Sequence, residues 1–475
     1  MSVMLICTLG SRDLQLSGEL IKPAREKGRE IMQNLDTVKG NLTYPIIRNV
    51  LEHILNIEKQ SISRLVLIPT DQDEQFTKSE YRLNDTIEFA RILKKLISEH
   101  YGHKVRDVKI SPITKNPAYL DTMFSFFNNT LNDAVFQMRD IDKCYVEQTG
   151  GVPAANMALL YQCVNKFKDK CHVLYVTESN QVISLRISDI ILDEKRKSLF
   201  PHLVEKYDYA SLCAHLDESR QDEHFMLNLC QYAQRRLHFD TDEAILIADR
   251  GINTFFADGR EVFEHLASDL QHLASDLQKV KSKDYVSLIA ELFYNMRIKY
   301  LRQEFVDFLG RLYRFQEAVP RYLIEKEFSI STDVDPKTGK QTDLDRLLES
   351  NEELKGFIAS QKMPKGGNID PSRVGTPRLV AFLDFLIEKK GMEKLRPVSD
   401  FFKKTEKLMN IRNNSIIGHG FKGVSEEIIK ENYDGDVLED LKAVVSLVLE
   451  KSGRESESDP FERINRILIE RIGQL

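Results

Sequence analysis

Short apolar runs alternate with longer amphipathic stretches through the first 190 residues. The runs typical of buried strands are residues 3–8, 64–69, 105–110, 143–147 and 171–176. Stretches with the spacing of apolar positions expected for a helix lie between them, at residues 46–55, 83–98, 118–136 and 153–167. Strand alternating with helix predicts an α/β domain with a mainly parallel sheet, and residues 182–187 fit a hairpin edge strand. Residues 14–42 follow neither pattern.

The second half of the chain shows helical periodicity only. Residues 265–278 repeat His-Leu-Ala-Ser-Asp-Leu-Gln, and this spacing keeps the leucines on one face of a helical hairpin arm or short coiled-coil seam. A long helical pattern covers 285–318, whereas 329–345 and 361–376 have the composition of loops. We therefore expect an all-α second half. The predicted segments are an α/β domain at 1–190, a helical connector at 191–240, an all-α domain at 241–455 and a C-terminal helix at 456–475.

Composition narrows the classes of protein that fit. The 475 residues are 42% hydrophobic and 29% charged, with a net charge of −6, which excludes a protein that coats nucleic acid generally. The six cysteines form no CxxC pair and lie partly in strand-like runs, as buried thiols in a reducing cytosol do. We see no basic leader and no long apolar run, so we expect a cytoplasmic protein without a signal peptide or membrane span.

Polar, glycine-rich loops follow the strands of the predicted sheet. In such sheets, ligands bind beyond the carboxyl ends of the strands. The Thr-Gly-Gly turn opens a helix, so its backbone N–H groups would face a phosphate or a base edge. A dinucleotide fingerprint and a P-loop are both absent from the sequence. The candidate ligand-binding residues are Leu9, Gly10, Ser11, Arg12, Thr70, Asp71, Thr114, Lys115, Asn116, Gln148, Thr149, Gly150 and Gly151.

Arg412 and His419 form the candidate catalytic pair. They are seven positions apart, about two turns of a continuous helix, so both side chains would leave from nearly the same face. Arginine offers a planar fork of donors to a phosphate, and histidine exchanges protons near neutrality. The pair could therefore cleave RNA without a metal, using the 2′-hydroxyl as nucleophile. The same pair also fits a plain helix end, where a cation meets the helix dipole and Gly418 and Gly420 stop the helix.

Two sets of motifs resemble known families. The sensor motif consists of Leu9-Gly10-Ser11 after the first strand, Asn116-Pro117 after the third and Glu147–Gly151 before a helix. It resembles the CARF (CRISPR-associated Rossmann fold) domain. The Arg412-Asn413…His419 element, with six intervening residues, resembles the HEPN ribonuclease motif. A CARF domain followed by a HEPN domain is the order found in ancillary ribonucleases of type III CRISPR systems.

The resemblance implies a Rossmann-like sensor and an all-α nuclease in an antiviral defence protein. It implies a homodimer whose two CARF domains bind a cyclic oligoadenylate, tetra- or hexa-adenylate, on the two-fold axis. It also implies allosteric activation of single-stranded RNA cleavage without a metal or cofactor. His419 would act as general acid/base, Arg412 as transition-state anchor and Asn413 as a positioning residue. Stable membership of the CRISPR complex is not expected.

Other interpretations stay open from the sequence. The chain could be a non-catalytic cyclic-nucleotide sensor whose helical half recruits a partner, or a toxin-like HEPN ribonuclease with a different activator. The sensor could also cut its own ring ligand, with Thr114 and Lys115 as candidates. The cations and tyrosines within 285–318 could grip single-stranded RNA or decorate a bundle helix. They are Arg297, Lys299, Arg302, Arg311 and Arg314 with Tyr294, Tyr300 and Tyr313.

Overall fold

The computed structural model divides the chain into two compact units, Met1–Arg196 and Lys197–Leu475, each considered by itself below. It describes residues 2–75, 77–138, 140–216, 221–258, 261–333, 337, 342–363, 366–373, 375–454 and 459–474. Within these ranges, none of the helices combines the length and apolarity that crossing a membrane requires. The predicted start of a C-terminal segment at residue 456 lies outside the described residues.

The first unit is built on a six-stranded sheet in the order β6-β5-β1-β7-β8-β9. The central strand β1 is parallel to both neighbours, with Cys7 beside Leu67 on one side and Glu147 on the other. Only β9 is antiparallel, paired with β8. The strands are β1 (Ser2–Thr8), β5 (Arg64–Ile68), β6 (Val108–Ile110), β7 (Ile141–Glu147), β8 (Cys171–Val176) and β9 (Val182–Leu185). The predicted mainly parallel sheet is confirmed.

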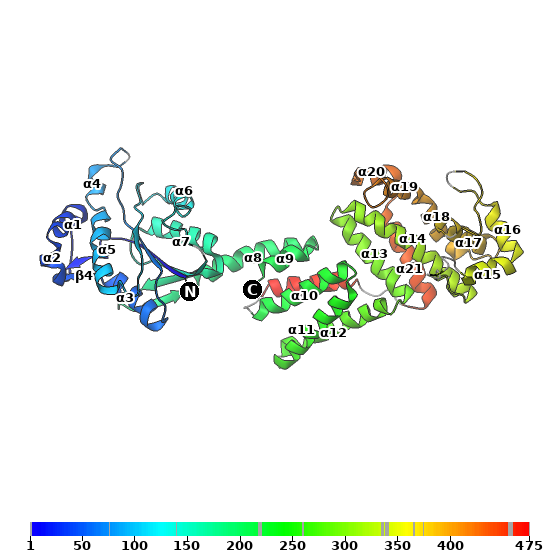
Figure 1. The fold of residues 1–475 in the computed structure, drawn as a ribbon, viewed down its shortest axis with the longest axis horizontal. Coiled ribbons are helices and arrows are strands. Elements are labelled where there is room, and N and C mark those ends of the chain that lie inside the picture. Colours follow the sequence, from blue (N-terminus) through cyan, green and yellow to red (C-terminus); the bar gives the residue numbers. More distant parts are fainter. Residues whose placement is uncertain are drawn as a thin grey trace. The chain divides into compact units, whose positions relative to one another are not determined.

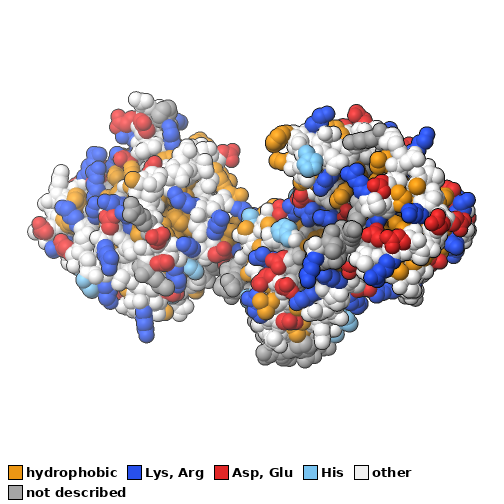
Figure 2. Space-filling view, turned by 45° about the vertical axis from the view of Figure 1, so that its right-hand side comes forward, with side chains coloured by type: hydrophobic (Ala, Val, Ile, Leu, Met, Phe, Trp, Pro, Cys, Tyr) orange, Lys and Arg blue, Asp and Glu red, His pale blue; other side chains and the backbone are white. Residues whose placement is uncertain are grey.

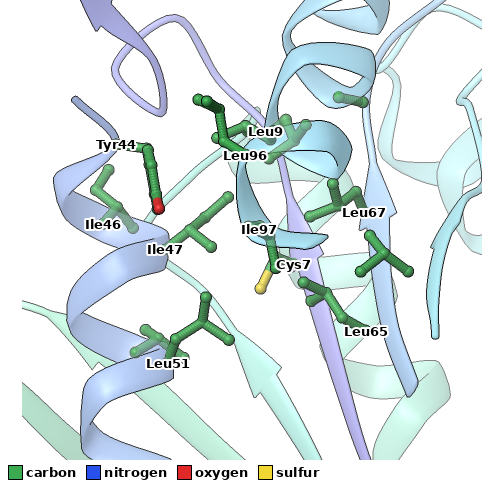
Figure 3. Packing of buried hydrophobic residues seen from close by; sticks show 14 of the residues in the cluster. Cys7, Leu9, Tyr44, Ile46, Ile47, Leu51, Leu65, Leu67, Leu96 and Ile97 are labelled. Carbon is green, nitrogen blue, oxygen red and sulfur yellow. The ribbon is translucent and has the colours of Figure 1, made fainter. Parts of the chain in front are cut away.

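Helices cover both faces of this sheet. Figure 1 shows α5 on one side of the strands and α6 and α7 on the other. Figure 3 shows the core on the first side, where Ile47 and Leu51 of α3 and Leu96 of α5 meet Cys7 and Leu65. The helices and short turns are α1 (Ala24–Gln33), α2 (Leu35–Val38), η1 (Lys39–Asn41), α3 (Pro45–Glu52), η2 (His53–Ile57), α4 (Ser79–Arg82), α5 (Ile87–Tyr101), α6 (Leu120–Thr130), α7 (Pro153–Phe167) and η3 (Lys168–Lys170).

The segment without a periodic pattern, 14–42, is ordered into small elements. Three two-residue strands, β2 (Gln15–Leu16), β3 (Glu19–Leu20) and β4 (Leu42–Thr43), form a separate sheet in the order β3-β2-β4. Helix α1 packs on α5, burying Ala24 and Ile31 in the same core as the main sheet. These elements are too short for a periodic pattern of hydrophobic residues to be detected in the sequence.

Helices make up the described part of the second unit, as predicted. α8 (Ile187–Glu205) begins in the first unit and ends in the second. The others are α9 (Tyr209–His215), α10 (Gln221–Leu237), α11 (Thr241–Asp258), α12 (Glu261–Lys281), α13 (Tyr285–Leu301), α14 (Phe305–Phe328), α15 (Thr342–Ser350), α16 (Glu352–Ser360), α17 (Thr376–Glu388), η4 (Glu393–Leu395), α18 (Arg396–Lys404), α19 (Glu406–Asn414), α20 (Glu426–Asn432), α21 (Val437–Ser452) and α22 (Pro460–Ile472).

The long helical pattern of the second half breaks where the sequence predicted continuity. Residues 285–318 form two helices, because Gln303 takes a positive φ of 60° between α13 and α14. Helices α18 and α19 meet at the buried Thr405. The repeat at 265–278 lies in α12, which packs along α11 as the expected hairpin. Leu266, Leu270, Leu273 and Leu277 are all buried there.

Separate hydrophobic clusters hold the helices of the second unit together. One joins α9, α10, α11, α12 and α22, and another joins α13, α14, α18 and α21. In Figure 1, α13, α14 and α21 run side by side, and α14 also contacts α19. Figure 2 shows basic and acidic side chains interspersed on the visible face of each unit.

Candidate active site and sensor edge

Helix α19 ends at Asn414, two residues after the candidate catalytic arginine. Ser415 leaves the helix in an extended conformation, with ψ at 176°. Its backbone N–H donates to the carbonyl oxygen of Arg412 at 3.1 Å, and its hydroxyl donates to the same oxygen at 2.7 Å. These bonds close the last turn of the helix, because they satisfy a carbonyl that a longer helix would use. The expected continuous helix from Arg412 to His419 is therefore wrong.

A tight turn returns His419 to the helix instead. The backbone N–H of His419 donates to the carbonyl oxygen of Asn413 at 2.8 Å, and that of Lys422 donates to Asn414 at 2.9 Å. Glycine at 418 permits this fold, because a Cβ there would lie 2.4 Å from the carbonyl oxygen of Asn413. The turn thus keeps His419 beside the end of α19, where the sequence had placed it by helical spacing.

The guanidinium group of Arg412 lies over an aromatic ring. Its central carbon is 4.7 Å from the centre of the Tyr313 ring, which α14 supplies. One terminal nitrogen donates to the side-chain oxygen of Asn413 at 3.1 Å, while the buried Nε has no hydrogen-bond partner. Among the described residues no carboxylate forms an ion pair with Arg412. Its positive charge is therefore not neutralised within this part of the chain.

The candidate catalytic side chains are open to solvent. Asn413 and His419 are exposed and Arg412 is half-buried, so none of them lies in the hydrophobic core. Two large apolar residues of the same segment are also exposed, Ile416 at 71% and Phe421 at 93%. This turn therefore presents basic and apolar groups together, as a surface for nucleic acid or for another chain would.

Most cations of the 285–318 pattern are neutralised inside the unit. Arg297 pairs with Asp459 and Glu462. Lys299 and Arg302 both pair with Glu304. Arg311 lies 3.7 Å from Asp307, and the exposed Arg314 pairs with Glu317 at 3.0 Å. These pairs favour the interpretation of a bundle helix over an RNA-gripping stripe. Tyr313 differs from these residues because its ring lies against the Arg412 guanidinium. The sequence gave Tyr313 no role separate from the other tyrosines of this pattern.

The four predicted ligand loops meet at the carboxyl edge of the parallel strands. Gly10 after β1 packs against Gly151 after β7, because a Cβ on Gly10 would lie 2.8 Å from the Gly151 nitrogen. The backbone N–H of Asp71 after β5 donates to the carbonyl oxygen of Ile113 after β6, at 2.9 Å. Gly151 has φ at +80°, which favours glycine. The residues predicted from these loops thus share one edge of the sheet.

Two buried carboxyl groups, Asp13 and Glu147, organise this edge; the sequence placed Glu147 in the sensor motif and gave Asp13 no role. Asp13 accepts the Gly10 N–H at 2.6 Å, and its other oxygen is buried without a partner. Glu147 accepts the backbone N–H groups of Thr149 and Gly150. Burial raises the pKa of both groups, and the Glu147 charge raises that of Asp13 further. The sequence did not predict that the two carboxyl groups would be buried together, because that depends on contacts between the loops after β1 and β7.

Several predicted ligand-binding side chains form hydrogen bonds or ion pairs with other residues of the edge. Thr70 exchanges hydrogen bonds with Thr86 at 3.1 Å, and the Leu9 carbonyl accepts the Thr86 hydroxyl. Asp71 pairs with Arg25. The Thr149 hydroxyl accepts the Val176 N–H at 2.7 Å. The backbone N–H groups of Thr70, Asp71 and Thr149 are also bonded within the edge. These residues therefore shape the edge.

Other predicted residues are more open. Ser11 and Asn116 are half-exposed, while Arg12, Thr114 and Lys115 are exposed. The side-chain nitrogen of Gln148 is buried without a hydrogen-bond partner. Lys115 lines an open hollow of about 510 Å³ with α6 residues that include Asp121, Ser125 and Asn129. The basic side chains of the edge are therefore the solvent-facing ones.

Part of the helical unit matches a known family of domains. Residues 277–469 match the family model described as the Cas_Csm6 HEPN domain, and this range includes Arg412, Asn413, His419 and Tyr313. An α/β unit with a mainly parallel sheet precedes it. A comparison with curated proteins gives no match.

The whole chain is similar in fold to Enterococcus italicus Csm6 bound to cyclic hexa-2′-fluoro-hexa-dAMP. The TM-score is 0.59 at 13% identity, covering 99% of this chain and 100% of that chain. At this identity the likeness establishes the fold. With the family match, it confirms the resemblance to the CARF–HEPN ancillary ribonucleases of type III CRISPR systems. Among the described residues, no cluster of three or more His, Cys, Asp or Glu is suited to hold a metal ion.

Proposed function

We propose that this protein is a metal-independent endoribonuclease that cleaves single-stranded RNA when a cyclic oligoadenylate binds its sensor. The observation that supports it best is the state of Arg412. Its guanidinium rests on an aromatic face with no carboxylate partner among the described residues, while the turn holds His419 at the same helix end. A buried or paired arginine would serve structure alone, whereas this cation is left to bind an anion.

The reaction proposed needs only the RNA and these side chains. One His419 takes the proton of the 2′-hydroxyl, and its oxygen attacks the adjacent phosphorus. The bond from phosphorus to the 5′-oxygen breaks, and a second copy of His419 donates a proton to that oxygen. Arg412 binds the non-bridging oxygens, where negative charge accumulates in the transition state. The products are a 2′,3′-cyclic phosphate and a 5′-hydroxyl. Asn413, which accepts a hydrogen bond from Arg412, acts as a positioning residue.

The second histidine is the reason to propose a homodimer. One chain offers one Arg412 and one His419, and an isologous dimer would pool two pairs in one RNA cleft. The sensor, residues 1–190, would meet its copy on the same axis and bind the symmetric ring. The connector at 191–240 would link it to the nuclease domain at 241–455. Activation requires that the ring bind the active arrangement more tightly than the inactive one.

The candidate ring-binding surface is the carboxyl edge of the sheet. The fold relative carries a cyclic hexanucleotide analogue, which supports a ring of adenylates as the ligand here. The exposed side chains of Arg12 and Lys115 would contact its phosphates. Cleavage of the ring by the sensor stays a prediction, with Thr114 and Lys115 as its candidate residues.

The test is a cleavage assay on single-stranded RNA with cyclic tetra- and hexa-adenylate, with and without EDTA. Wild type should cleave with EDTA present, and the 5′ fragments should end in a 2′,3′-cyclic phosphate. His419→Ala should lose cleavage while binding the ring with unchanged affinity. His272→Ala is the matched control, because this exposed histidine lies on α12, far from the turn in sequence. Retained cleavage by His419→Ala would remove the assignment.

A further inference from the structure

The contact between α14 and the end of α19 assigns a role to a residue outside the Arg–His motif. Tyr313 lies in α14, between Leu312 and Arg314, and its ring supports the Arg412 guanidinium at 4.7 Å. The other α14 cation near this ring, Arg314, lies farther away, at 5.8 Å from the ring centre. Arg314 is also exposed and paired with Glu317, so only Arg412 depends on the ring for its place.

The ring face is the main constraint on the Arg412 side chain. Its other described contact is a hydrogen bond to Asn413, the next residue, whose own side chain is exposed. Nε is buried without a partner, so no hydrogen bond fixes the inner end of the guanidinium. A planar cation resting on an aromatic face keeps its edge donors free. A carboxylate could hold Arg412 as firmly, but it would neutralise the charge and occupy those donors.

Tyr313 is itself held in place. It is half-buried in α14, which contacts α19 and contributes Phe308, Leu312 and Phe315 to the core. Burial raises the pKa of Tyr313, and the nearby Glu317 carboxylate raises it further, so the phenol stays neutral at physiological pH. A neutral ring on a packed helix is a rigid platform, and its face attracts a cation without a full negative charge.

The geometry points to Tyr313 as the positioning residue for Arg412. The Tyr313 ring stacks beneath the Arg412 guanidinium and orients the guanidinium N–H donors toward the scissile phosphate. The ring does this without neutralising the positive charge of Arg412. This inference rests on the proposed function, because it assigns the residue that prepares the transition-state anchor. Tyr313 does not touch the reacting atoms, and its contribution lies in the orientation of Arg412 before RNA binds.

Single-turnover cleavage of a labelled RNA, at saturating ring activator, tests the assignment. Tyr313→Leu removes the aromatic face and should slow the cleavage step about tenfold to hundredfold, because a displaced catalytic group costs about that much. Its RNA dissociation constant should stay within about threefold of wild type. Tyr313→Phe keeps the face and loses the hydroxyl, so its rate should stay within about threefold. Tyr313→Met, flexible and apolar, should behave like the leucine variant and serves if that variant fails to show a cooperative thermal transition.

The outcomes distinguish the positioning role of Tyr313 from the proposed ribonuclease function. A wild-type rate in a folded Tyr313→Leu or Tyr313→Met protein overturns the positioning role. A Tyr313→Phe rate as low as that of Tyr313→Leu overturns the ring-face mechanism and shifts the role to the hydroxyl. Arg412→Ala is measured alongside. If it cleaves like wild type, the proposed function fails first; if it is inactive while the Tyr313 variants are normal, only the positioning role fails.

Discussion

The backbone N–H of His419 donates to the carbonyl oxygen of Asn413 at 2.8 Å. This hydrogen bond holds His419, the candidate general acid/base, next to the end of α19, which carries Arg412. Residues 415–418 therefore form a closed turn beyond α19 and not further turns of the helix. The position of His419 depends on that turn, which makes the glycines within it as testable as the histidine.

Gly418→Ala should disable cleavage while leaving the helices folded. A Cβ at 418 would lie 2.4 Å from the Asn413 carbonyl oxygen and 2.6 Å from that of Arg412, so the turn must open. We expect a loss of at least about tenfold in the rate of RNA cleavage, because His419 would move relative to Arg412. Gly423→Ala is the control, since its Cβ would meet no atom within 4 Å. Equal rates for the two variants would contradict the account.

Gly150→Ala should reduce activation by the ring. Its Cβ would lie 2.6 Å from the Thr8 carbonyl oxygen and 2.6 Å from a carboxylate oxygen of Asp13, so the loop after β7 must shift. We expect ring affinity, measured by calorimetry, to fall about tenfold or more. Gly40→Ala, at a position with no atom within 4 Å of its Cβ, should bind as wild type does. Unchanged affinity in Gly150→Ala would show that this loop is not part of the ring site.

The stability of the sensor edge should depend on pH through Asp13. Burial first, then the Glu147 charge, raises the pKa of Asp13, while Arg12 and the Gly10 N–H oppose the rise. A raised folded-state pKa contributes stability that is present below the unfolded pKa and lost as pH rises through the folded value. Asp13→Asn, which imitates the protonated acid, should therefore gain melting temperature relative to wild type as pH rises from about 4 to 8.

Differential scanning fluorimetry across that pH range measures the effect. Asp36→Asn is the control, because the Asp36 side chain is 99% exposed in the same unit. Its melting temperature should follow wild type at every pH. If the difference in melting temperature between Asp13→Asn and wild type stays constant or shrinks as pH rises, the raised pKa of Asp13 is contradicted.

Arg236→Met should destabilise the helical unit. Arg236 is buried and forms two hydrogen bonds with Glu291, at 3.0 and 2.7 Å, between α10 and α13. Removing one partner leaves an uncompensated buried charge, which costs about 3–5 kcal/mol of unfolding free energy. Arg235→Met breaks only the exposed pair with Asp240 and should cost about 1 kcal/mol or less. Urea unfolding followed by circular dichroism distinguishes the two, and similar losses would contradict the prediction.

The parallel sheet could be predicted closely because its strands are buried on both faces. Val3–Cys7 and Leu65–Ile68 are apolar runs that match strands almost residue for residue. The two-residue strands such as Gln15–Leu16 could not be found in this way, because two positions define no period. The break at Gln303 was missed for a related reason, since apolar spacing on either side continues through it.

The chemistry of the residue types was enough to predict the candidate site from the sequence. It was not enough to predict the residues that support the site. Arg412 and His419 were recognisable because their functional groups suit phosphate and proton transfer. Tyr313 lies on another helix, Asp13 was given no role, and Glu147 was recognised only as part of a motif at a strand end. Their roles arise from contacts between elements distant in sequence, which neither spacing nor composition encodes.

We propose that a cyclic oligoadenylate switches on RNA cleavage by Arg412 and His419. The most direct measurement is the initial rate of fluorogenic RNA cleavage as cyclic tetra- or hexa-adenylate is titrated into wild-type protein in EDTA, with Arg412→Ala in parallel. The account predicts a saturable, at least tenfold rise in rate with one of the two rings and no rise in the variant. A rate that neither ring changes, or the same rise in Arg412→Ala, would contradict it.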